Sequence, residues 1–241
     1  MNIRLSSLLT LLRAAKNRFV ADDLDYHIIK FGIAAGMQML VNRRGNLRLE
    51  LGFYEIGVAR HFLHLAKGVA VGYDIGSAMG YYVLAMCKQG VQSIVAFEPD
   101  PQRVLYLQET LRRNNIRDDR VQILSCFVSD KSEGKECRID DLVTTSRIRP
   151  PNFVKMDIDG AEIQALLGMR HTVLTYHPAF IIEVHSAALE QGCMQFLRTA
   201  GYDQIHVVDN GPLINHFMPE GRPIELNRWV VAWRSMHIGH C

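Results

Sequence analysis

The stretch Val69-Ala-Val-Gly-Tyr-Asp-Ile-Gly-Ser-Ala-Met-Gly80 decides the fold of this chain. An apolar, β-branched run ends in Asp74, and two glycines, Gly76 and Gly80, then flank a tight turn before an amphipathic pattern. This order predicts a strand that passes into a helix across a bound ligand. A second apolar run ends in Glu98, eighteen residues after Gly80, where a carboxylate can accept hydrogen bonds from ribose hydroxyls. We therefore predict a nucleotide-cofactor site.

The position of Asp74 separates two classes of cofactor. A nicotinamide or flavin cofactor packs its pyrophosphate against glycine amides and a helix N-terminus, where a neighbouring carboxylate would repel it. S-Adenosyl-L-methionine has no phosphate, and its ammonium and sulfonium groups suit a nearby acid. The spacing Gly76-x-x-x-Gly80 also departs from G-x-G-x-x-G. Both features favour S-adenosyl-L-methionine, and the alternative is a tight turn that binds no ligand.

Strands and helices alternate from Val69 onward, which specifies a parallel sheet with helices on both faces. No helix separates the last two predicted strands, so we expect them to pair as an antiparallel edge hairpin. The predicted class is α/β, with a seven-stranded Rossmann-like methyltransferase sheet that is mostly parallel. The predicted strands are 69–74, 93–97, 121–124, 153–156, 179–184, 204–208 and 228–233. The predicted helices are 79–88, 101–114, 161–167 and 187–200.

The N-terminal 51 residues are predicted to be an extension, and residues 52–241 the methyltransferase domain. Leucines and basic residues in the first twenty positions indicate an amphipathic helix docked on the domain. A membrane-surface or signal role is the alternative. Alternating apolar residues between Gly36 and Leu51 suggest a β-hairpin that turns at Gly45, and residues 54–67 follow a helical pattern.

The composition is that of a globular protein, with 241 residues, 48% hydrophobic and 22% charged. A formal charge of +2 gives no general reason to expect nucleic acid as a partner. No apolar run reaches the length that spans a bilayer, so no integral membrane span is expected. The five cysteines are unclustered, which we interpret as reduced thiols in a cytoplasmic protein.

Seven short motifs follow one another between Gly52 and Trp233. They are Gly52-Phe-Tyr-Glu55, Asp74-Ile-Gly-Ser-Ala-Met-Gly80, Phe97-Glu-Pro-Asp-Pro101, Val128-Ser-Asp130, Arg138-Ile-Asp-Asp-Leu142, Val154-Lys-Met-Asp-Ile-Asp-Gly-Ala-Glu162 and Ile182-Glu-Val-His185. In this order they resemble the FkbM-type S-adenosylmethionine-dependent methyltransferases. The segment 154–162 is the most specific to that family.

The resemblance implies a set of cofactor-binding residues. They are Glu55, Asp74, Gly76, Gly80, Glu98, Cys126, Phe127 and Asp157. Asp74 and the two glycines would line the methionine side, Glu98 would hold the ribose, and Glu55 would approach the amino-acid end. Cys126 and Phe127 would lie against the adenine. The chain departs from the family at two positions, because Ala78 stands where Asn is usual and Asp159 where Glu is usual.

Methyl transfer is an in-line displacement, so the protein mainly aligns the acceptor, the methyl group and the sulfur. A hydroxyl acceptor also needs a base, and Asp157, Asp159, Glu183 and His185 should converge at the carboxyl ends of their strands. We assign His185 as the catalytic base, with Asp157 or Asp159 as its orienting partner. This assignment has no metal, and the alternative is Mg²⁺ held by the two aspartates.

The predicted function is methylation of a hydroxyl on a small molecule or glycan. An N-methyltransferase acting on a peptide or amine would not need His185, because a neutral amine attacks unaided. A non-catalytic protein with this fold is a third alternative. We expect the N-terminal region and the loop 210–227 to recognise the acceptor.

Overall fold

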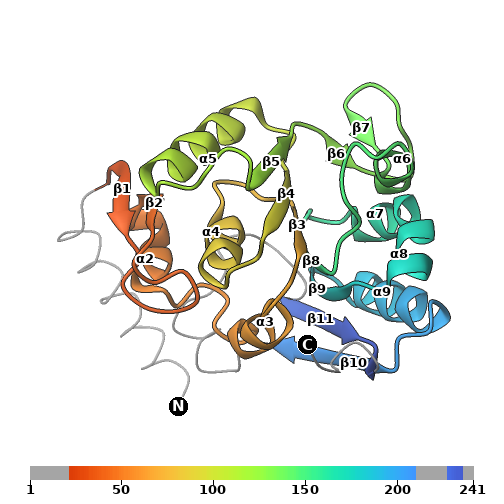
Figure 1. Cartoon of the computed structure of the whole chain (residues 1–241). Coiled ribbons are helices and arrows are strands. Elements are labelled where there is room, and N and C mark those ends of the chain that lie inside the picture. Colours follow the sequence, from red (N-terminus) through yellow and green to blue (C-terminus); the bar gives the residue numbers. More distant parts are fainter. Residues whose placement is uncertain (1–21, 210–226, 236–241) are drawn as a thin grey trace, which may run out of the picture.

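The computed structural model describes residues 22–209 and 227–235, and these residues form a twisted seven-stranded sheet between two layers of helices (Figure 1). The strand order is β10-β11-β9-β8-β3-β4-β5. The strands are β3 (Val71–Ile75), β4 (Ser93–Phe97), β5 (Val121–Leu124), β8 (Phe153–Met156), β9 (Ala179–Val184), β10 (Gln204–Asp209) and β11 (Arg228–Trp233). The first five are mutually parallel, whereas β11 is antiparallel to both β9 and β10. The predicted sheet, including its antiparallel edge pair, is confirmed.

Helices cover both faces of this sheet, as Figure 1 shows. One face packs against α3 (Ala59–Leu65), α4 (Tyr81–Lys88) and α5 (Pro101–Arg113). The other packs against α6 (Ile139–Thr144), α7 (Glu162–Gly168), α8 (Arg170–Tyr176) and α9 (Ala187–Thr199). Each long helix begins at a polar cap, since Asp100 accepts a hydrogen bond from Gln102 N in α5 and Ser186 accepts one from Leu189 N in α9.

Alternate residues of each strand enter different cores because successive side chains point to opposite faces. On β9, for example, Ile181 packs in the core with α3 and α4, whereas Ile182 packs in the core with α7 and α9. All six residues of β9 are buried. The central strands are therefore apolar on both faces, as parallel strands between helical layers must be.

The predicted hairpin around Gly45 is wrong. Residues 43–51 form a helix, α2 (Arg43–Leu51), with a kink at Asn46 where φ is −130°, and the preceding hairpin pairs β1 (Leu24–Ile28) with β2 (Gln38–Asn42). Asn42 starts the helix because its side chain accepts a hydrogen bond from Gly45 N at 2.8 Å, and Gly52 ends it in the left-handed conformation. The caps at both ends thus override the alternating leucines.

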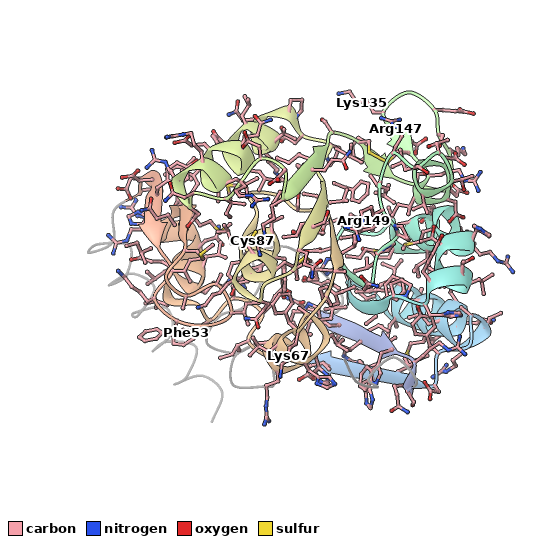
Figure 2. All side chains as sticks on the ribbon, in the orientation of Figure 1. Phe53, Lys67, Cys87, Lys135, Arg147 and Arg149 are labelled. Atoms are coloured by element: carbon pink, nitrogen blue, oxygen red, sulfur yellow. A yellow bond between two sulfur atoms is a disulfide. The ribbon has the colours of Figure 1, made fainter. Side chains whose placement is uncertain are left out.

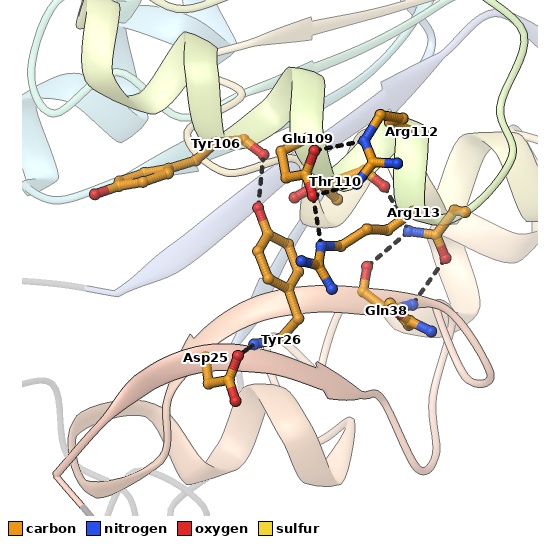
Figure 3. Close-up of polar contacts among 9 residues, drawn as sticks. Asp25, Tyr26, Gln38, Tyr106, Glu109, Thr110, Arg112 and Arg113 are labelled. Atoms are coloured by element: carbon orange, nitrogen blue, oxygen red, sulfur yellow. Dashed lines mark hydrogen bonds and ion pairs between the residues drawn. The ribbon is translucent and has the colours of Figure 1, made fainter.

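This hairpin is held against the C-terminal end of α5 (Figure 3). Asn114 accepts a hydrogen bond from Gln38 N at 2.8 Å and donates one to Gln38 O at 2.7 Å. The Arg113 guanidinium lies 4.0 Å from the centre of the Tyr26 ring. Apolar residues of the same segment, including Ile29 and Val41, belong to the core that contains α3 and α4.

Two further predictions need correction. The helix predicted over 54–67 is confined to Ala59–Leu65, because Glu55 has a φ of 47° and interrupts the helical backbone. The interpretation of all cysteines as reduced thiols is wrong for Cys126 and Cys137, which form a disulfide (Figure 2). The bridge links the short parallel strands β6 (Phe127–Val128) and β7 (Glu136–Cys137). Cys87 and Cys193 are free and buried.

Within the described ranges, the helices are too short or too polar to cross a membrane. The predicted N-terminal amphipathic helix, most of the predicted acceptor loop at 210–227 and Cys241 lie outside those ranges.

Candidate active site

Strand register brings four charged side chains to the carboxyl ends of the central strands, on one face of the sheet. Asp74 on β3 pairs with Lys155 on β8, and both are buried. Asp157 follows β8 by one residue, and His185 follows β9 in the same way. Because residues two apart on a strand share a face, these side chains lie on the side of the sheet that α3 and α4 cover.

His185 lies between the two predicted aspartates. Its Nε2 atom is 3.5 Å from Oδ1 of Asp157 and 3.2 Å from Oδ1 of Asp159. The imidazole is 9% exposed, whereas the Asp159 side chain is 63% exposed. The N-cap residue of α9 is Ser186, so the His185 imidazole is not used to cap the helix. The structure thus brings together the three predicted catalytic residues.

A buried network around Lys155 was not assigned from the sequence. The Lys155 Nζ atom lies 3.5 Å from Oε2 of Glu55 and 3.6 Å from Oε2 of Glu183. The same Glu55 oxygen accepts hydrogen bonds from Tyr82 Oη at 2.5 Å and Trp229 Nε1 at 3.0 Å. Glu55 therefore joins the segment before α3 to α4, β8 and β11. The alternation Lys155-x-Asp157 was the available signal, since it places both residues on one face.

Burial and the shared charge of this network shift the pKa values of its acids. Burial raises the pKa of Asp74 from 3.8 to about 7, although Lys155 opposes the rise. Burial and the neighbouring Glu55 raise the pKa of Glu183 well above its usual range. Burial also acts to raise the pKa of Asp157, but Lys155 and the hydrogen bond to His185 outweigh it and lower that pKa to about 2. The site thus contains acids in different protonation states near neutral pH.

The turn after β3 is tied to the end of β4. Gly76 N and Ser77 N both donate to Phe97 O at 3.0 Å. Glu98 is buried, and its two oxygens accept hydrogen bonds from Ala78 N at 2.8 Å and Asp100 N at 2.9 Å. Each carboxylate oxygen can accept a second bond, so Glu98 keeps the capacity to bind a hydroxyl.

Both glycines of the turn have positive φ, 85° at Gly76 and 95° at Gly80. A Cβ atom at Gly76 would collide with the carbonyl group of Asp157, and one at Gly80 would lie 2.5 Å from Leu107 Cδ1. These glycines are thus required by packing inside the protein, independently of any ligand. Ala78 also has a positive φ, 46°, in the position where the resembled family has Asn.

The predicted adenine residues follow β5. Phe127 is 53% exposed, and Cys126 is half-buried and bonded to Cys137. The aromatic ring thus remains available to a ligand, while the disulfide fixes the backbone beside it.

Three ligating side chains are close enough to suggest a metal site. Asp157, Glu183 and His185 each offer one atom, and these atoms lie within 4.8 Å of one another. The sequence suggested Asp157 and Asp159 as metal ligands. Among the described residues, Asp157 is instead grouped with Glu183 and His185.

A cavity of about 580 Å³ lies at the opposite, amino ends of the strands, near the C-terminal ends of α4 and α5. Its cations already have partners, since Arg120 donates to Cys87 O and Val91 O, and Lys88 donates to Ala35 O. The cavity therefore offers no obvious charge for a ligand.

The family model described as the methyltransferase FkbM domain matches residues 127–204, which include Asp157, Asp159, Glu183 and His185. No curated protein matches the chain. A crystal structure of methyltransferase FkbM from Methylobacillus flagellatus is similar, with a TM-score of 0.56 and 20% identity over 68% of this chain. This chain spans 43% of that protein's length. The METTL16 methyltransferase domain is similar with a TM-score of 0.52 and 16% identity, over 95% of this chain and 79% of that one.

Both structural likenesses support the Rossmann-like methyltransferase fold, and the family match covers the strand ends that hold the candidate catalytic residues. Residues 127–204 therefore match the FkbM methyltransferase domain, within a chain that has the Rossmann-like fold of methyltransferases.

Proposed function

We propose that the chain methylates a hydroxyl group on a small molecule or glycan, with S-adenosyl-L-methionine as the methyl donor. One observation carries this proposal. A histidine lies within 3.5 Å of two carboxylates at the edge of the sheet where Asp74 and the glycine turn would hold the cofactor. A base beside a methyl donor is what a hydroxyl acceptor requires.

The residues at this edge fit a cationic cofactor. Asp74 Oδ2, Ser77 Oγ and Glu55 Oε1 are buried and have no hydrogen-bond partner among the described residues. Buried polar atoms normally have partners, so these atoms suit a ligand with several donors. S-Adenosyl-L-methionine supplies such donors together with a methyl group activated by the sulfonium. The proposed cofactor-binding residues are Glu55, Asp74, Gly76, Gly80, Glu98, Cys126, Phe127 and Asp157.

His185 would take the proton of the acceptor hydroxyl. The pKa of Asp157 is lowered to about 2, chiefly because Lys155 and the His185 hydrogen bond overcome its burial, so its carboxylate stays ionised at neutral pH. An ionised carboxylate beside the imidazole stabilises the imidazolium that forms. Asp159, on the exposed side, would orient the ring or pass the proton to water.

The first test is cofactor binding measured by titration calorimetry on the full chain. We expect one S-adenosyl-L-methionine per chain, and at a hundred times its dissociation constant the ligand should stabilise the fold by about 2.7 kcal/mol. Absence of binding would indicate a non-catalytic protein with this fold.

The second test is His185→Ala, assayed by mass spectrometry with candidate hydroxyl acceptors. Turnover should fall by about 10²–10⁴-fold, the usual contribution of a general base, with cofactor binding retained. His171→Ala is the matched control, because His171 is exposed on α8. Unchanged turnover in His185→Ala would indicate an acceptor that needs no base, such as an amine.

A cytoplasmic location remains a prediction, and the Cys126–Cys137 disulfide argues against it because such bonds persist mainly in oxidising compartments.

A further inference from the structure

We propose that Asp157, Glu183 and His185 bind a divalent transition-metal cation at the carboxyl ends of β8 and β9. This inference rests on the proposed function and changes one part of it. In the cation-loaded protein His185 is a ligand, and the cation takes over the activation of the acceptor hydroxyl. It also departs from the metal-free assignment made from the sequence.

Strand geometry holds the three ligands in place. Glu183 and His185 are two residues apart at the end of β9, so their side chains share a face. Asp157 follows β8, whose last registered pair with β9 is Met156 and Ile182. Continuing that register places Asp157 opposite Glu183. Both strands are fully buried, which makes this a rigid platform.

The spacing of the ligand atoms is close to that of a filled site. Bonds from a divalent transition metal to histidine nitrogen or carboxylate oxygen are about 2.0–2.2 Å long, so ligand atoms lie up to about 4.4 Å apart. The three candidate atoms lie within 4.8 Å of one another. Shifts of a few tenths of an ångström in the side chains would therefore complete the geometry.

The surrounding charge favours a cation. Glu55, Asp74 and Glu183 are buried and Asp157 is half-buried, and all four lie around Lys155, so carboxyl groups outnumber the lysine that they share. Glu183 Oε2 accepts no hydrogen bond from the described residues, and its ion pair with Lys155 is long, at 3.6 Å. A carboxylate oxygen has two lone pairs, so Oε2 can face Lys155 with one and bind a metal with the other. A divalent cation would supply the further positive charge that these acids need in order to be ionised together.

One imidazole nitrogen and two carboxylate oxygens form a mixed donor set. Carboxylates suit Mg²⁺ and Mn²⁺, whereas imidazole suits the transition metals, so Mn²⁺ fits both ligand types. The Asp157 side chain is 24% exposed, which leaves an accessible side for an acceptor. A hydroxyl bound to the cation loses its proton more readily, and Asp159, 63% exposed, would accept that proton.

The test measures Mn²⁺ binding by the full chain, after a chelator has removed bound metal and dialysis has removed the chelator. Binding is detected as loss of the free Mn²⁺ signal in electron paramagnetic resonance. We expect one Mn²⁺ per chain, and Mg²⁺ should compete at least tenfold more weakly. Glu183→Gln, Asp157→Asn and His185→Ala should each weaken Mn²⁺ binding at least tenfold. Glu133→Gln is the matched control, because it makes the same chemical change on an exposed loop.

Circular dichroism identifies any variant that fails to fold. If Glu183→Gln fails to fold, His185→Ala and Asp157→Asn still test the site. No Mn²⁺ uptake by the wild type, or uptake that these substitutions leave unchanged, overturns the inference. Cofactor binding and methyl transfer are measured separately in the presence of EDTA. Methyl transfer that persists there without Mn²⁺ uptake leaves the proposed function intact, whereas Mn²⁺ uptake without cofactor binding refutes only the proposed function.

Discussion

Ala78 adopts a left-handed backbone conformation, with a φ of 46°, inside the turn that follows β3. Such a conformation costs a residue with a Cβ atom roughly 1–2 kcal/mol, and glycine avoids this cost. We expect Ala78→Gly to raise the free energy of unfolding by about 0.5–1 kcal/mol, since part of the gain is lost to backbone entropy. Urea denaturation measures the change.

Ala85→Gly provides the control for this prediction. Ala85 lies inside α4, where the backbone is helical and glycine should destabilise the protein by about 0.5–1 kcal/mol. Effects of the same sign at both positions would show that the turn stores no strain at Ala78.

Asp74 should make the stability of the ligand-free protein depend on pH. Because burial raises its pKa from 3.8 to about 7, the folded state holds a proton in this range that the unfolded state releases. Stability from this group is therefore present at low pH and is lost as pH rises toward 7. The difference corresponds to at most about 4 kcal/mol. Asp74→Asn removes the titration.

Urea denaturation of wild type and Asp74→Asn between pH 4 and pH 8 tests this expectation. The difference in unfolding free energy should move in favour of the variant as pH rises. The Asp74→Asn substitution itself should weaken binding of S-adenosyl-L-methionine. Parallel pH curves for the two proteins would mean that Asp74 titrates normally in the folded state.

At the scale of elements, periodicity predicted the central sheet because most of its strands are uninterrupted apolar runs. The ranges 93–97, 121–124, 153–156 and 179–184 are the same in the prediction and the structure. Periodicity failed at residues 43–51, where Leu47, Leu49 and Leu51 alternate as in a strand. There the capping side chain of Asn42 and the left-handed Gly52 decide for a helix. Capping acts at single residues, so a pattern summed over a window conceals it.

Gly76 couples the turn after β3 to the end of β8. Its positive φ alone should cost an alanine roughly 1–2 kcal/mol, and the collision with the Asp157 carbonyl adds to this. We expect Gly76→Ala to lose about 1–3 kcal/mol more than that cost, since backbone must move, and to abolish cofactor binding. Thermal denaturation and calorimetry measure the two effects.

Gly90→Ala separates the two contributions. Gly90 has a φ of 80°, but a Cβ atom there would meet nothing within 4 Å. This variant should therefore incur only the backbone cost and keep the cofactor. Equal losses at Gly76 and Gly90 would mean that the contact between the turn and β8 is not restrictive.

At the scale of the whole molecule, the candidate site was only partly predictable. Asp74, Asp157 and His185 could be placed because each follows or ends a recognisable strand, and the ends of parallel strands meet. Lys155 and Trp229 could not, because their roles depend on lateral neighbours. Trp229 reaches Glu55 only because β11 inserts beside β9, which brings residues 174 positions apart in the sequence together. A single sequence carries no signal for that pairing.

Asn114 tests whether the N-terminal hairpin folds with the sheet or separately from it, as the proposed division between residues 51 and 52 would allow. Asn114→Ala removes two hydrogen bonds with the Gln38 backbone, which should cost about 1–3 kcal/mol. Ile29 and Val41 of the hairpin segment share a core with α3 and α4, so we expect the loss to lower global stability. Tryptophan fluorescence, from Trp229 and Trp233 on β11, and hydrogen exchange of the β2 amides should then report the same decrease. Gln108→Ala, on the exposed side of α5, should change neither measurement. If β2 amides lose protection while the fluorescence transition stays in place, the hairpin opens on its own and forms a separate unit.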